Sequence, residues 1–329
     1  MPSIPRLPPL LDTALDRGLI GYGNLGYLAR RRGWSEEMPR LDGKVAIVTG
    51  AKAGLGRATT AGLARLGATV HMAVRGREDG ERVKRELERE IPGADLAVDV
   101  LDVSSLADVR AYATAFTGPL HVLVHNAGVM PPERTETAEG HELMLATHVL
   151  GPHLLTSLLR PRLERDARVI WVSSGGMYGQ RLRADDLEYE RGEYSATTGY
   201  ARTKRAQVVL SELWAQVLRG DGVTAHAMHP GWVATGGLAA SLPGFSRFAR
   251  PILRTDEQGA DTTVWLAAAD EPARAGGRFW HDRRARPTHY LGRAKETEAD
   301  RRALWEACER LTAPGPPSPS RRSPTARET

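Results

Sequence analysis

The chain has 329 residues and a formal net charge of +5, with a pI of about 9.5. Acidic and basic residues are interspersed through most of it. We find no basic face with interleaved aromatic residues and therefore expect no nucleic-acid partner. The single cysteine, Cys308, excludes an intrachain disulfide and is typical of a reducing compartment, so we expect a cytoplasmic protein. No run approaches about 18 apolar residues, so no transmembrane span is expected.

Residues 1–40 precede the first predicted strand and form an N-terminal extension. Its early prolines predict that the first ten residues are extended or disordered. Residues 10–34 mix leucines and tyrosines with glycines, and charges interrupt the apolar stretch, so it is not a typical signal peptide. We favour a strap that packs on the domain surface. The alternative is a segment that contacts a membrane surface or a partner, helped by Arg30–Arg32.

From residue 41 onwards, short apolar runs that predict buried strands alternate with longer segments of helical character. The predicted strands are 45–48, 68–74, 96–100, 120–124, 168–172, 223–228 and a short last strand at 277–280. The predicted helices are 58–66, 80–90, 108–116, 140–159, 200–219, 258–269 and 296–311. This alternation implies a parallel sheet covered on both faces. We expect one α/β domain over 41–292, a C-terminal helix within 293–312 and a disordered tail at 313–329.

The first strand leads into a glycine-rich turn. Val45–Val48 is a short, mostly β-branched run that stops at Thr49, and Gly50, Gly54 and Gly56 follow in the pattern G-x-x-x-G-x-G. A strand, a glycine turn and a helix N-terminus can bind a pyrophosphate, because the backbone comes close and free N–H groups face the anion. On this stretch alone, an ordinary tight turn between strand and helix explains the glycines equally well.

Further motifs follow in a fixed order: Asn126-Ala-Gly128, Ser174, Tyr200-x-x-x-Lys204 and Pro230-Gly231. Together with the glycine turn, they resemble the short-chain dehydrogenase/reductase superfamily over residues 41 to about 292. The resemblance implies a single doubly wound Rossmann domain with about seven parallel strands. It also implies a nicotinamide cofactor and hydride transfer between that cofactor and a carbonyl or alcohol.

Three residues are expected to carry the chemistry. Tyr200 and Lys204 are four apart on a predicted helix and therefore share one face. A tyrosine has a pKa of about 10, and a nearby lysine cation lowers it, so that Tyr200 can act as acid and base. By resemblance, Ser174 hydrogen-bonds the same substrate oxygen, Ser173 is the less favoured serine, and Lys204 also holds the nicotinamide ribose.

One position departs from the family pattern. Many relatives carry an asparagine, thought to bind a relay water, where this chain has His148. Histidine can bind water and relay a proton. The alternative is a relaxed position with a weakened relay, and the sequence does not decide between them.

The second predicted strand bears on cofactor choice. A carboxylate about 20 residues beyond the glycines would bind the ribose hydroxyl of NAD, but Arg75 stands there, with Arg77 close by and Lys52 inside the turn. These cations fit a 2′-phosphate, which favours NADP(H) over NAD(H). The alternative is that they are ordinary surface cations.

The resemblance assigns Asp102 to the adenine, and Val233 and Thr235 to the nicotinamide amide and the phosphates. The full set expected to bind the cofactor is Gly50, Lys52, Gly54, Leu55, Gly56, Arg75, Asp102, Asn126, Tyr200, Lys204, Val233 and Thr235.

The substrate is less well specified. By resemblance the pocket is lined mostly by apolar residues, Met177, Tyr178, Trp232, Leu238, Leu242, Phe245 and Phe248, which favour a small hydrophobic carbonyl compound or alcohol. No residues have metal-ligand spacing, so no metal site is expected. The leading function is an NADP(H)-dependent oxidoreductase, and the alternative is a cofactor-binding sensor or scaffold without turnover. Homo-oligomerisation is left open.

Overall fold

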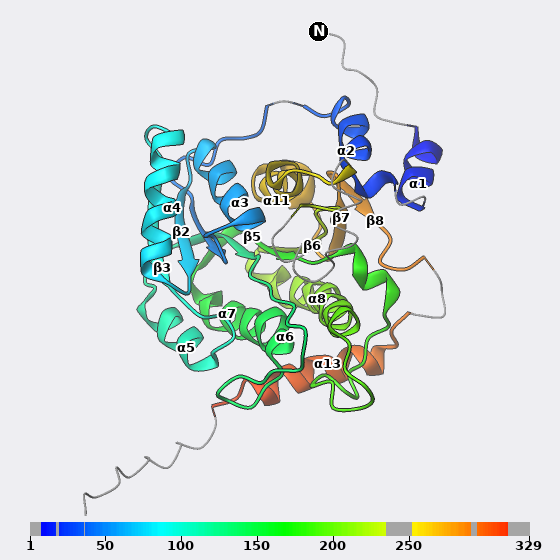
Figure 1. Cartoon of the computed structure of the whole chain (residues 1–329). Helices are drawn as coiled ribbons and strands as arrows, with labels where there is room; N and C mark the ends of the chain where they lie inside the picture. Colours follow the sequence, from blue (N-terminus) through cyan, green and yellow to red (C-terminus); the bar gives the residue numbers. More distant parts are fainter. Residues whose placement is uncertain (1–7, 18–19, 36, 235–251, 291–294, 315–329) are drawn as a thin grey trace, which may run out of the picture.

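The computed structural model describes residues 8–17, 20–35, 37–234, 252–290 and 295–314. An eight-stranded sheet in the order β3-β2-β1-β4-β5-β6-β7-β8 forms its centre (Figure 1). The strands are β1 Val45–Thr49, β2 Thr69–Val74, β3 Asp95–Val100, β4 Leu120–His125, β5 Leu163–Val172, β6 Thr224–Met228, β7 Arg278–His281 and β8 Arg284–Arg286. Strands β1 to β7 pair in parallel, and β8 returns antiparallel to β7. The doubly wound α/β fold expected from the sequence is confirmed.

Helices cover both faces of the sheet (Figure 1). On one face lie α3 (Gly54–Arg65), α4 (Arg77–Glu90) and α11 (Asp256–Ala268). On the other lie α5 (Leu106–Ala115), α6 (Leu143–Leu145), α7 (Gly151–Leu159) and α8 (Ala196–Leu218), with α13 (Glu298–Leu311) packed on α8. A π-helical segment, Ala146–Leu150, joins α6 to α7, and α12 (Asp270–Ala273) follows α11.

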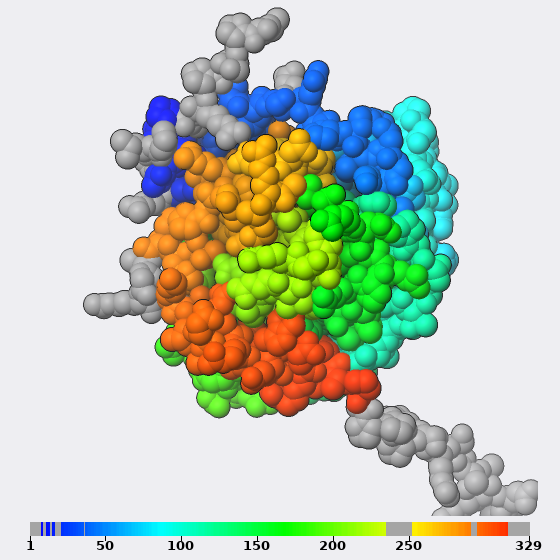
Figure 2. All heavy atoms as spheres, turned by 180° about the vertical axis from the view of Figure 1, so that it is seen from behind, coloured from blue at the N-terminus to red at the C-terminus, as the bar shows by residue number. Residues whose placement is uncertain are grey.

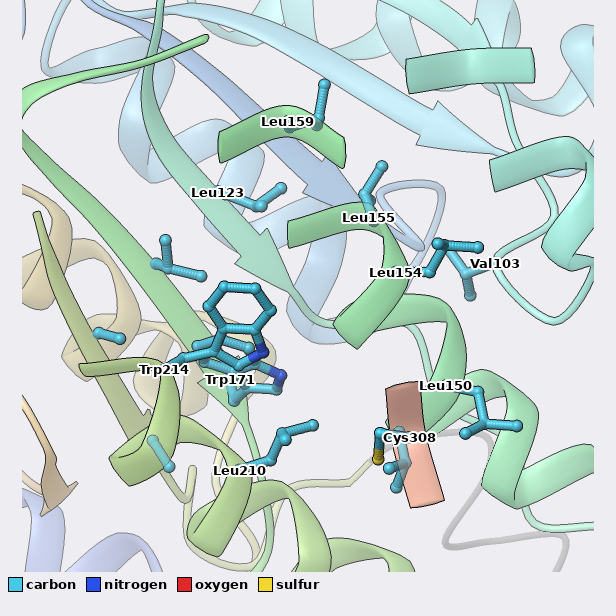
Figure 3. Packing of buried hydrophobic residues seen from close by; sticks show 14 of the residues in the cluster. Val103, Leu123, Leu150, Leu154, Leu155, Leu159, Trp171, Leu210, Trp214 and Cys308 are labelled. Atoms are coloured by element: carbon cyan, nitrogen blue, oxygen red, sulfur yellow. The ribbon is translucent and has the colours of Figure 1, made fainter. Parts of the chain in front are cut away.

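Large apolar side chains join the sheet to its helices (Figure 3). Leu123 of β4 and Trp171 of β5 are fully buried in one cluster with Leu155 of α7 and Trp214 of α8. Cys308 of α13 lies in the same cluster and behaves as a small apolar residue. Burying a leucine-sized side chain stabilises the fold by roughly 1.5–3 kcal/mol, so this cluster fixes the sheet on which the site is built.

Strand β8 was missed from the sequence because Arg284-Ala-Arg286 contains no apolar run. It forms through a two-residue turn in which Asp282 and Arg283 both have positive φ, +51° and +53°. Positive φ at both turn residues is the geometry of a type I′ hairpin. Most such turns use asparagine and glycine, so side-chain contacts must hold this one in place.

Residues 8–17 and 20–35, the N-terminal strap, pack on the domain as favoured from the sequence. The extended start expected there is wrong from Pro9 onwards, because α1 spans Pro9–Arg17 and proline suits a first helical turn. Residues 1–7 and 315–329 lie outside the described residues. A second helix, α2, spans Asn24–Arg31 and buries Tyr27 and Arg30, whereas its Leu25 and Leu28 are exposed. None of the helices described is long and apolar enough to cross a bilayer.

Candidate active site

A cavity of about 510 Å³ opens where the parallel strands end, beside the N-terminal half of α8. The structure brings together at this cavity every predicted catalytic or cofactor-binding residue that it describes. These are Gly50, Lys52, Gly54, Leu55, Gly56, Arg75, Asp102, Asn126, Ser174, Tyr200, Lys204 and Val233. Thr235 lies outside the described residues, as do Leu238, Leu242, Phe245 and Phe248.

The glycine turn lies tightly against the end of β4. Gly50 has a φ of +68°, and a Cβ on Gly56 would lie 2.2 Å from the Gly50 carbonyl oxygen, so a side chain there would displace the backbone. Asn126 donates its amide to the carbonyl oxygens of Thr49 (2.9 Å) and Gly50 (3.4 Å). The Thr49 hydroxyl accepts from the backbone N–H of Asn126 at 3.0 Å. Asn126 therefore holds the turn in shape as well as lining the cavity.

The N-terminus of α3 faces this turn without a side-chain cap. Its N-cap residue is Ala53, which forms no capping hydrogen bond. The first N–H groups of a helix need a partner, and their dipole favours an anion. The turn and the helix end therefore fit a phosphate group.

At the end of β2, Arg75 is exposed. Within the described part of the chain its guanidinium has no carboxylate partner. Lys52 is paired with Asp79 at 2.7 Å, and both side chains are about half exposed. Asp102 accepts from the backbone N–H and the hydroxyl of Ser104, at 2.9 and 2.7 Å, which fixes its carboxylate at the rim. Arg75 is thus the cation best placed to meet a ligand.

The two serines after β5 have different partners. Ser173 is buried and donates its hydroxyl to the Lys204 carbonyl oxygen at 2.9 Å. Ser174 accepts from the backbone N–H of Gly176 at 3.2 Å and hydrogen-bonds Tyr200. The geometry therefore places the Ser174 hydroxyl, and not that of Ser173, beside the tyrosine.

Burial sets the protonation of Tyr200 and Lys204. Burial raises the pKa of Tyr200 to about 12, and the hydrogen bond with Ser174 only partly opposes this. Burial lowers the pKa of Lys204 to about 7, and its ammonium group donates to the Val172 carbonyl oxygen at 2.9 Å. On balance the pKa of Tyr200 is thus raised, because burial outweighs the hydrogen bond with Ser174. The lowering by Lys204 that the sequence suggested stays a prediction. A lysine with this pKa is only partly charged at neutral pH, and the tyrosine remains protonated.

His148, the departure from the family pattern, is fully buried with both ring nitrogens engaged. Its Nε2 accepts from the backbone N–H of Val129 at 3.0 Å, so the proton is on Nδ1, which lies 2.8 Å from the Thr203 hydroxyl. Thr203 in turn donates to the Tyr200 carbonyl oxygen. The ring stands edge-on to Tyr200, with centroids 5.5 Å apart.

Burial and Lys204 keep the pKa of His148 well below its ordinary value. A neutral ring with two protein partners has no nitrogen left for a relay water. His148 thus supports Tyr200 and the loop after β4. It lies in the π-helical segment, a distortion that is often found at functional sites.

The apolar part of the cavity differs from the expected set. Trp232 lines it as expected, together with Val129, Met130 and Leu143, which sequence reasoning missed. Met177 is instead buried in the core, and Tyr178 donates its hydroxyl to the Pro287 carbonyl oxygen at 2.7 Å. Val129 and Met130 directly follow the Asn126-Ala-Gly128 motif, which was the available signal.

Comparisons with known proteins identify the family of this chain. The short chain dehydrogenase family matches residues 44–243. A cattle protein (Bos taurus) called dehydrogenase/reductase SDR family member 12 is 38% identical over 90% of this chain and 95% of its own. Mouse (Mus musculus) polyprenol dehydrogenase is 39% identical over 84% of this chain and 86% of its own.

One solved structure is also similar, from Beutenbergia cavernae and provisionally assigned as an NAD(P)-dependent gluconate 5-dehydrogenase, with NADP bound at low occupancy. It has a TM-score of 0.58 and 26% identity, over 74% of this chain and 96% of that one.

A parallel Rossmann sheet with these motifs at its carboxyl edge defines a nicotinamide-dependent oxidoreductase. The chain belongs to the short-chain dehydrogenase/reductase family and acts on CH–OH groups.

Lys204 gives a first test through stability. Its pKa is about 7 in the folded chain against an ordinary value of 10.5, so between these values the unfolded chain binds more protons. Stability therefore rises with pH through this window. Lys204→Met removes this contribution. We expect the wild-type Tm to rise relative to that of Lys204→Met between about pH 7 and pH 9. Calorimetry at a series of pH values would measure both Tm values.

Lys44→Met, at an exposed lysine, is the control and should follow wild type at every pH. A Tm difference between wild type and Lys204→Met that stays constant with pH would contradict the shifted pKa.

Proposed function

We propose that this chain is an NADP(H)-dependent oxidoreductase that transfers hydride between the nicotinamide and a hydrophobic carbonyl compound or alcohol. The observation that carries the proposal is the meeting of Ser174, Tyr200 and Lys204 with the glycine turn in one cavity. Apolar residues beside Tyr200 support a hydrophobic substrate. The similarity to a polyprenol dehydrogenase, whose name indicates a lipophilic alcohol, supports it too.

The cofactor, when bound, supplies the hydride for reduction or accepts it in oxidation. In the reductive direction, Ser174 donates a hydrogen bond to the carbonyl oxygen and orients it. Tyr200 then gives its phenolic proton to that oxygen as the carbonyl carbon gains the hydride, so the product is a neutral alcohol. A protonated Tyr200 at neutral pH, as its raised pKa implies, suits this role of proton donor.

The remaining residues hold the reactants. The open N-terminus of α3 and the glycine turn would bind the pyrophosphate, and Lys204 would hold the nicotinamide ribose. Exposed Arg75 would bind the 2′-phosphate, because a guanidinium pairs with phosphate through two hydrogen bonds. The bound NADP in the Beutenbergia cavernae relative supports the preference.

Tyr200→Phe removes the proposed proton donor and leaves the rest of the cavity intact. Turnover should fall at least about 100-fold, the scale of lost general acid catalysis, while the Kd for NADPH changes little. Steady-state kinetics and a binding titration would measure both. The matched control is Tyr112→Phe, whose hydroxyl bonds Asp99 at 2.7 Å outside the cavity lining. Near-normal turnover in Tyr200→Phe would refute the role of Tyr200.

Arg75→Asp replaces the proposed phosphate partner with a group that repels phosphate and accepts from a ribose hydroxyl. Binding of NADPH should weaken by about 2 kcal/mol or more, as for a lost charge-assisted hydrogen bond, and NADH should gain relative to it. Arg89→Asp, at an exposed arginine near the end of α4, is the control. A wild type that prefers NADH at equal concentrations would show that the interpretation of Arg75 is mistaken.

A further inference from the structure

The N-terminal strap reaches one wall of the active-site cavity. The Tyr22 carbonyl oxygen accepts from the backbone N–H of Trp232 at 2.8 Å. The adjoining Gly231 has a φ of +82°, and a Cβ there would lie 2.5 Å from the same carbonyl oxygen. Pro230 to Val233 all line the cavity. Strap backbone is thus in direct contact with the segment that, by family resemblance, meets the nicotinamide end of the cofactor.

Arg254 joins the same two segments through its side chain. It donates to the carbonyl oxygens of Gly21 (2.8 Å) and Gly23 (3.3 Å) in the strap, and to that of Pro230 (3.1 Å) in the cavity wall. Its backbone also pairs with this wall, since its N–H donates to Trp232 at 2.8 Å. One buried guanidinium therefore determines the spacing between strap and wall.

A buried cluster of charges fixes Arg254 in turn. The Asp282 carboxylate accepts from Arg254 at 2.6 and 2.8 Å and from Arg30 of the strap at 2.7 Å. The cluster contains three arginines and three aspartates whose side chains are at most 4% exposed: Arg30, Arg254, Arg286, Asp12, Asp16 and Asp282. Buried charges are tolerated when they are paired. Asp12, Asp16 and Arg30 belong to the strap, so the strap supplies three of the six charged groups that pair with one another in this cluster.

Backbone strain marks the same place. Asp282 occupies the β7–β8 turn with positive φ, as does Arg283, which is tied to Asp261 by two contacts of 2.8 Å. Such backbone persists only when its surroundings hold it, and it gathers at functional positions. Figure 2 shows the strap, in dark blue, against the orange β7–β8 region.

We propose that the strap is part of the cofactor site, where Tyr22 and Arg254 position the Pro230–Val233 wall against the nicotinamide end of the bound cofactor. Arg254 is a positioning residue, and Arg30 acts on the wall through Asp282. This inference rests on the proposed function, because it assigns the cavity to NADP(H). The adenine half of the cofactor would lie at the glycine turn and Arg75, which the strap does not touch in the described contacts.

The test compares two probes, NADPH and 2′,5′-ADP, which carries the adenine and the 2′-phosphate but lacks the nicotinamide. Arg254→Lys keeps a charge for Asp282 but loses the fork that reaches three carbonyl oxygens. We expect its Kd for NADPH to rise about tenfold or more, as for a lost charge-assisted hydrogen bond, with the Kd for 2′,5′-ADP unchanged. Arg30→Lys should give a smaller change of the same pattern.

The control is Arg301→Lys, which weakens a part-buried ion pair with Glu212 between α13 and α8, away from the cavity lining. It should bind both probes as wild type does. Thermal unfolding would show whether Arg254→Lys folds. If it does not, the inference is tested with Arg30→Lys alone, because Arg30 does not contact the Pro230–Val233 wall and is proposed to act on it through Asp282.

Equal weakening of both probes, or no weakening of NADPH, in the folded variants would overturn the inference and leave the proposed function standing. A wild type that binds neither probe would overturn the proposed function, and this inference with it.

Discussion

The site depends on the parallel sheet, because β1, β4, β5 and β6 all end at one edge and deliver their following residues to the same cavity. The glycine turn follows β1, Asn126 follows β4, and Ser174 follows β5. The hydrogen bonds between Asn126 and Thr49 then hold the ends of β1 and β4 at a fixed separation. Tyr200 and Lys204 are presented to this edge by α8, which packs on β5 and β6.

Buried charge is handled in two ways within this one region. Lys204 has no carboxylate partner in the described residues, and burial therefore lowers its pKa until the neutral form is well populated. Burial would also raise the pKa of Asp282, but His281, Arg254 and Arg30 hold it well below its ordinary value. The first arrangement leaves a group that can change its charge near neutral pH. The second gives a rigid connection between strap and cavity wall.

Local pattern was sufficient to predict much of the molecule. Strands such as Val45–Thr49 were found because β-branched runs mark buried strands, and the spacing of Tyr200 and Lys204 identified one helix face. Their protonation could not be predicted, because it depends on how deeply each group is buried. The sequence suggested that Lys204 lowers the pKa of Tyr200, whereas burial raises it.

Long-range contacts account for the rest. Arg30, Arg254 and Asp282 lie far apart in the chain, so their cluster is visible only in the folded protein. The sequence singled out Arg30 only within Arg30–Arg32, for the alternative of a membrane or partner contact, whereas the fold buries it. Strand β8 depends on the same cluster, since Asp282 stands in its turn. His148 likewise depends on other segments of the chain. Burial and Lys204 keep its pKa low, and the hydrogen bonds with Val129 and Thr203 determine which ring nitrogen carries the proton.

The central claim is that this site turns over its substrate and does not merely bind a cofactor. Stopped-flow measurement of NADPH oxidation under single-turnover conditions, with a panel of lipophilic aldehydes and ketones, tests it most directly. The account predicts loss of the reduced nicotinamide signal with an equal amount of alcohol formed by at least one compound. Tightly bound NADPH that stays reduced across the whole panel would contradict it and favour a cofactor-binding sensor or scaffold.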